Sequence, residues 1–93
     1  MFVRVVRFTD VTAERVESLV ARIEEGGPPP GLPIKKLQMV FDEAEGTAVV
    51  LQYFDSEADL RTGSETFAAM DPSETPGTRA SVDTGELKVE REV

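Results

Sequence analysis

Four polar residues stand out by position, because each interrupts or ends an apolar run: Tyr53, Arg4, Arg7 and Gln52. Tyr53 is the only tyrosine, and its hydroxyl could donate a hydrogen bond to a phenolate or carbonyl. The alternative is a core aromatic whose hydroxyl reaches the edge of a sheet. Arg4, Arg7 and Gln52 need partners in apolar surroundings, so each is predicted to line a cavity or to pair across a dimer interface.

In a cavity, Arg4 or Arg7 would hold an anionic ligand, because a guanidinium group suits carboxylates and enolates. These four residues are therefore the candidate ligand-binding residues. The sequence predicts no catalytic residue.

The composition excludes several chemistries. The chain has no Cys and no His, which removes thiolate chemistry, disulfides, zinc knuckles and His-based acid–base catalysis. Asp42, Glu43 and Glu45 do not have the spacing of a calcium loop and are typical of a charged hairpin turn. We therefore expect neither a metal nor a cofactor. The net charge of -8 disfavours nucleic acid and anionic membrane surfaces as partners.

The length and the hydropathy pattern indicate one domain over residues 1–93. No apolar run approaches the roughly 20 residues that a membrane-spanning helix needs. Charged residues interrupt the first apolar run, which is atypical of a signal peptide, so we expect a cytoplasmic protein.

The first half of the chain predicts a strand, a helix and a connector. Residues 2–8 are rich in Val and Phe, as in a strand. Thr12 is the expected N-cap of a helix that ends at Gly26 and Gly27. Residues 28–33 contain four prolines and predict an extended, polyproline-like connector.

The second half predicts a hairpin, a helix and a last strand. Residues 36–42 and 47–54 are expected to form an antiparallel pair around the acidic turn. Ser56 is the expected cap of a helix that is broken near Asp71 and Pro72. A last strand is predicted from about residue 79 to the clean alternation of 87–93, with Gly85 as a bulge.

This β-α-β-β-α-β order predicts an α+β, ferredoxin-like fold: a four-stranded antiparallel sheet in the order 4-1-3-2 with two helices on one face. The runs 2–8 and 47–54 are apolar on both faces, as central strands should be. The helices cover one face only, so we expect a homodimer through the open sheet face. Substitution of Val6 or Val50 by Asp is predicted to give a monomer or an unfolded protein.

Two segments, MFVRVVRF at 1–8 and VVLQYFDSEADLR at 49–61, resemble the dimeric α/β-barrel superfamily, in particular antibiotic biosynthesis monooxygenases. The resemblance implies a cavity in each protomer between sheet and helices. Some members of the family oxidise polycyclic phenols without a cofactor, and others degrade haem. The chain lacks the helix His of the haem-degrading members and the cavity Asn and Trp of the monooxygenases.

Three functions are compatible with the sequence. The first is a homodimer that binds a small apolar or aromatic molecule without catalysis. The second is a cofactor-independent, monooxygenase-like enzyme that acts on an aromatic or polyketide-like substrate. The third is an interaction subunit without a ligand. The cavity discriminates between the first two: side chains that fill it would remove most of the support for catalysis, whereas an open, partly polar pocket that Tyr53 or an Arg reaches would keep the enzyme function possible. The third function predicts a monomer or a complex with a different protein.

Overall fold

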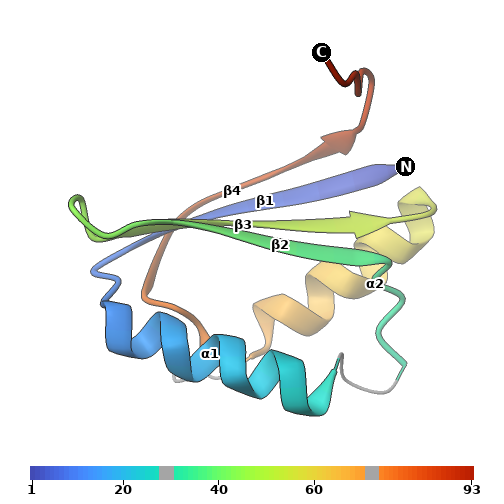
Figure 1. Cartoon of the computed structure of the whole chain (residues 1–93). Helices are drawn as coiled ribbons and strands as arrows, with labels where there is room; N and C mark the ends of the chain where they lie inside the picture. Colours follow the sequence, from blue (N-terminus) through green and yellow to red (C-terminus); the bar gives the residue numbers. More distant parts are fainter. Residues whose placement is uncertain (28–30, 71–73) are drawn as a thin grey trace.

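The computed structural model describes residues 1–27, 31–70 and 74–93, and these form an antiparallel sheet of four strands with two helices on one face (Figure 1). The elements are β1 (Phe2–Thr9), α1 (Ala13–Gly26), β2 (Lys36–Asp42), β3 (Thr47–Phe54), α2 (Glu57–Ala68) and β4 (Thr78–Glu86). The strand order is β2-β3-β1-β4. This arrangement confirms the predicted ferredoxin-like fold.

Both helices begin at the predicted caps. The Thr12 hydroxyl accepts a hydrogen bond from the backbone N–H of Arg15 at 3.3 Å, and the Ser56 hydroxyl accepts one from Asp59 at 3.1 Å. At the other end of α1, Gly27 has a φ of 63° and donates its N–H to the Ile23 carbonyl. The predicted break at Asp71 and Pro72 lies outside the described residues, as does the start of the proline connector at residues 28–30.

The predicted hairpin is formed by β2 and β3. Its turn is closed by Gly46, which has a φ of 67° and donates its N–H to the Asp42 carbonyl at 2.9 Å. The Asp42 side chain also accepts a hydrogen bond from the Glu45 backbone at 3.2 Å. The acidic residues therefore build the turn, as the sequence indicated.

The last strand differs from its prediction. β4 ends at Glu86, and residues 87–93 follow without regular secondary structure. The irregularity in the ladder lies opposite Arg7 and Phe8, which pair with Ser81 and Arg79, whereas Gly85 pairs regularly with Val3. The predicted bulge at Gly85 is therefore wrong. All of β4 is exposed, so its sequence has no apolar alternation to mark it.

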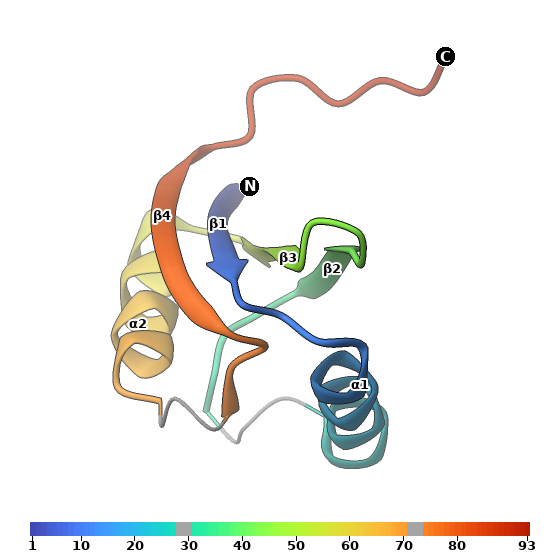
Figure 2. The ribbon, with the colours of Figure 1, turned by 90° about the vertical axis from the view of Figure 1, so that its left-hand side faces the viewer.

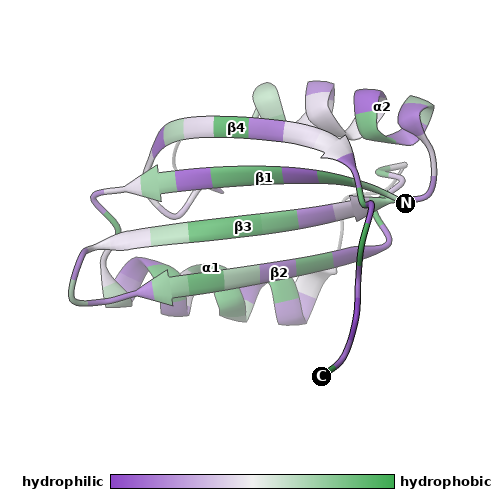
Figure 3. Cartoon of the chain, turned by 90° about the horizontal axis from the view of Figure 1, so that it is seen from above, coloured by the Kyte–Doolittle hydropathy of each residue, from purple (hydrophilic) through white to green (hydrophobic). Residues whose placement is uncertain are grey.

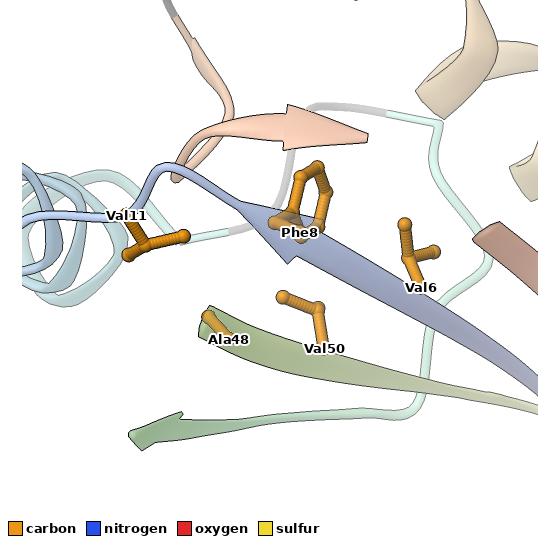
Figure 4. Packing of buried hydrophobic residues seen from close by; sticks show 5 residues of the cluster. All are labelled: Val6, Phe8, Val11, Ala48 and Val50. Atoms are coloured by element: carbon orange, nitrogen blue, oxygen red, sulfur yellow. The ribbon is translucent and has the colours of Figure 1, made fainter. Parts of the chain in front are cut away.

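The core lies between the sheet and the helices. Its buried cluster consists of Val6, Phe8, Val11, Ala48 and Val50, which Figure 4 shows gathered on one side of β1 and β3. Val6 and Val50 are thus buried under the helices and do not lie on the open face. The prediction that they form the dimer interface is wrong, because residues of opposite parity occupy the open face.

The other face of the sheet is covered by neither helix, as Figure 3 shows from above. The pairs Val3–Tyr53, Val5–Leu51 and Arg7–Val49 project to this side. The valines, Leu51 and Tyr53 are partly exposed. Half of the central apolar surface is therefore left uncovered in the single chain.

The helices lie under different edges of the sheet. Figure 2 shows α2 on the β4 side and α1 toward β2 and β3, with residues 87–93 leading away from the sheet. Within the described parts of the chain, no helix has the length and apolar character needed to cross a bilayer.

Candidate ligand-binding site

A cavity of about 460 Å³ opens on the helix-covered face of the sheet. Most side chains around it are apolar: Val6, Phe8, Met39 and Val50 of the sheet, Leu19 and Ile23 of α1, and Phe67 and Met70 of or just after α2. This volume falls within the range of about 300–1,000 Å³ that is usual for ligand pockets. The aromatic and methionine side chains line the cavity without filling it, and Arg4 reaches it, so the enzyme function stays possible beside simple binding.

Two of the four predicted site residues meet in the wall of this cavity. Arg4 of β1 pairs with Gln52 of β3, so both side chains project to the same face. The Arg4 Nη1 donates a hydrogen bond to the Gln52 Oε1 at 2.9 Å, and each residue is only 4% exposed. The guanidinium carbon lies 5.5 Å from the centre of the Phe67 ring, within cation–π range.

The Arg4 guanidinium is buried without a carboxylate. Its Nε has no hydrogen-bond partner among the described residues, and none of their ion pairs includes Arg4. Burial lowers the pKa of Arg4, and the nearby charge of Arg79 lowers it further. A buried cation with an orphan donor costs folding free energy, and an anion in the cavity would reduce that cost.

Tyr53 and Arg7, the other two predicted site residues, lie on the open face and do not line this cavity. The Tyr53 hydroxyl donates a hydrogen bond to the Gln38 Oε1 at 2.8 Å, and the Lys36 ammonium lies 5.1 Å from its ring centre. The predicted cavity role is wrong for these two residues, because their strands present them to the opposite side. Pairing across a dimer stays a prediction for Arg7.

Arg79 is a site residue that sequence reasoning missed. It pairs with Phe8 beside the irregularity in the β1–β4 ladder, which brings it to the helix-covered face. Arg4 and Arg79 also border a second hollow of about 470 Å³ between α2 and β4. Sequence periodicity does not reveal this position. The extra residue in β4 at the irregularity changes which side chains of the strand face the helices.

Arg22 of α1 and Glu74 were also missed as cavity residues. Arg22 lies off the apolar stripe of its helix, so the sequence pattern does not place it at a cavity. Glu74 lies between two predicted elements, where periodicity gives no information. Both contribute charge to the cavity wall, so they bear on which ligands it accepts.

Comparison with known proteins finds solved structures that resemble this chain in fold. No protein-family model matches the sequence, and no curated protein is similar to it. A Deinococcus radiodurans protein assigned as an antibiotic biosynthesis monooxygenase matches with a TM-score of 0.59 and 10% identity, covering 100% of this chain and 98% of that one. A further antibiotic biosynthesis monooxygenase matches with a TM-score of 0.58 and 13% identity, over 98% of this chain and 100% of the other.

The chain has the fold of the antibiotic biosynthesis monooxygenases. A variant of MhuD with two manganese protoporphyrin IX molecules bound per active site shares it, with a TM-score of 0.57, 14% identity and coverage of 100% of this chain and 98% of that chain. These matches confirm the resemblance seen in the sequence. Identities this low establish the fold alone.

The residues around the cavity do not suit a haem. Proteins hold haem iron through His, Cys or Tyr, or through Met together with His. The chain has no His or Cys, and Tyr53 lies on the other face of the sheet. Of these haem-iron ligands, the described cavity residues offer only the thioethers of Met39 and Met70, without the His that accompanies Met in such sites. In the described residues, no group of three His, Cys, Asp or Glu could hold a metal ion.

Proposed function

We propose that this chain is a small-molecule binding protein, which holds an apolar or aromatic molecule in the cavity between sheet and helices. The observation that carries the proposal is an open cavity whose wall is apolar except for a few charged and amide groups, with Arg4 and Gln52 buried in it. A pocket of this kind gains affinity from apolar burial and orientation from its polar groups.

One structural neighbour supports the proposed kind of ligand. The MhuD variant holds two manganese protoporphyrin IX molecules per active site, so a protein of this fold binds flat polycyclic molecules. The cavity of this chain carries aromatic and thioether side chains, Phe8, Phe67, Met39 and Met70, which pack well on flat rings. A flat aromatic body is therefore the ligand shape that we propose.

Titration calorimetry with 2-naphthamide, a neutral aromatic probe, tests the proposal. Leu19 is buried and faces the cavity from α1, so Leu19→Trp should fill part of the space and weaken binding by at least about tenfold, the equivalent of 1.4 kcal/mol. The matched control is Val20→Trp, since Val20 is the next residue, is 40% exposed and does not line the cavity. Absence of binding, or equal binding by both variants, would contradict the proposal.

We also propose that two copies associate through their open sheet faces. Val3, Val5, Val49 and Leu51 form an apolar surface on the two central strands, and neither helix covers it. The same face of β4 carries Ser81 and Asp83, so the apolar area is confined to the middle of the sheet. An apolar centre with a polar rim is typical of a dimer interface.

Light scattering coupled to size exclusion tests the association. Leu51→Asp places a charge in the centre of the proposed interface and should convert the dimer to a folded monomer. Val20→Asp, on the outer side of α1, should leave the dimer intact. A monomeric wild type, or a Leu51→Asp variant that stays dimeric, would show that the interface is elsewhere or absent. A stable homodimer would count against the interaction-subunit alternative.

A monooxygenase-like activity is the second candidate, and the names of the two monooxygenase structures favour it. The substrate itself would supply all four electrons that reduce O₂: 1-naphthol and O₂ would give 1,4-naphthoquinone and water. Glu74 is the one carboxylate among the described cavity residues, and the chain has no His. The cavity therefore offers few groups for proton transfer, whereas binding requires only the space and the polar wall.

A further inference from the structure

We propose that the ligand carries a carboxylate, or a similar singly charged group, which Arg4 binds inside the cavity. This inference rests on the proposed cavity binding and names the ligand class: an organic anion with an apolar body.

The first support is the unfinished hydrogen bonding of Arg4. Gln52 accepts from one terminal nitrogen of the guanidinium, while the buried Nε has no partner among the described residues. Guanidinium groups bind carboxylates through two parallel N–H donors, and Nε is one of the donors of that fork. Arg4 therefore retains an unused donor of the type that a carboxylate takes.

The second support is the charge of the cavity wall. The described cavity residues include Arg4, Arg22 and Arg79, none of which forms an ion pair with another described residue, and a single carboxylate, Glu74. Two lysines contribute less: Lys35 pairs with Asp55 at 3.2 Å, and Lys36 lies over the Tyr53 ring on the other face.

This local excess of positive charge contrasts with the net charge of -8 of the whole chain. The arginines around this apolar space give the cavity a positive electrostatic potential, which favours an anion there although the chain as a whole is acidic. Most of the wall is apolar, so a small hydrated anion such as phosphate would lose its water there without burying apolar surface in return. The ligand must therefore combine charge with an apolar body.

The orientation of such a ligand follows from the position of Phe67. Its ring lies 5.5 Å from the Arg4 guanidinium, on the side of α2, and the apolar sheet residues Val6 and Val50 lie next to Arg4 and Gln52 along the strands. A carboxylate on Arg4 would thus leave the ligand body against Val6, Val50 and Phe67.

A matched pair of probes, 2-naphthoate and 2-naphthamide, tests the inference because the two differ in charge and share their shape. The chain has no Trp, so the fluorescence of the naphthalene ring reports binding without Trp background. Wild-type protein should bind naphthoate about 10- to 100-fold more tightly than naphthamide, the range that a charge-assisted hydrogen bond supplies. Arg4→Met should abolish this preference by weakening naphthoate alone.

The matched control is Arg7→Met, on the same strand and the opposite face, which should leave both affinities unchanged. A second measurement does not depend on any variant: the NMR signal of the Arg4 Nε–H should shift with naphthoate and stay in place with naphthamide. Equal affinity of the wild type for both probes, or an Arg4 Nε–H signal that does not shift with naphthoate, would overturn this inference and leave the cavity-binding function intact. Failure of both probes to bind would overturn both.

Discussion

The two helices cover the same face of the sheet, yet they pack on it in different ways. α2 presents Gly63 to Phe54, whose side chain is fully buried. α1 buries Leu19 alone and leaves Val20 and Ile23 each 40% exposed. A glycine lets the α2 backbone approach the aromatic ring, whereas the larger side chains of α1 line an open cavity.

The difference shows how so short a chain combines a stable fold with a space for a ligand. α2 packs closely on β3 where Gly63 meets the buried Phe54, while α1 borders the open cavity beside Arg4 and Gln52. Ligand-binding regions are commonly less well packed than the rest of a domain. One added carbon atom should therefore lower the free energy of unfolding at the contact between α2 and Phe54, and should not lower it beside the cavity.

The largest effect is expected for Gly63→Ala. A Cβ at this position would lie 2.3 Å from the Phe54 Cε1, so the fully buried ring or the helix would have to shift. Such overpacking costs about 1–3 kcal/mol. The better helix propensity of Ala returns about 1 kcal/mol, so the free energy of unfolding should fall by up to about 2 kcal/mol. Urea denaturation measures it.

Gly26→Ala is the control for that substitution. A Cβ there would meet no atom within 4 Å, and Gly26 lies at the end of α1 with an ordinary helical backbone. Helix propensity should then act alone and stabilise the protein by up to about 1 kcal/mol. If Gly63→Ala stabilised the protein as much as Gly26→Ala, α2 would not pack closely on Phe54.

The sequence revealed the elements better than the site. The caps at Thr12 and Ser56 and the turn at Asp42 to Gly46 depend on local chemistry, and all were predicted correctly. Arg4 and Arg7 are three residues apart, so the sequence places them on opposite faces of a strand. It does not say which face the helices cover, because valines occupy both.

β4 was harder to predict for a related reason. Every residue of Thr78–Glu86 is exposed, so no apolar period marks the strand. The predicted strand therefore extended to the alternating residues 87–93, which have no regular secondary structure. The displaced pairing of Arg79 follows from the irregularity opposite Arg7 and Phe8. Long-range pairing produces that feature, and a single sequence carries no local signal for it.

A smaller change in the free energy of unfolding is expected for Val50→Ile, which adds one carbon atom beside the cavity. Val50 is nearly buried and lines the cavity, so the added methyl group should enter free space without strain. Burial of one such group contributes at most about 0.8 kcal/mol, and Ile keeps the β-branched shape that suits a strand. Urea denaturation should therefore show a free energy of unfolding that is unchanged or slightly raised. A loss as large as that of Gly63→Ala would mean that the α1 side is packed as tightly as the α2 side, and that the cavity is closed in solution.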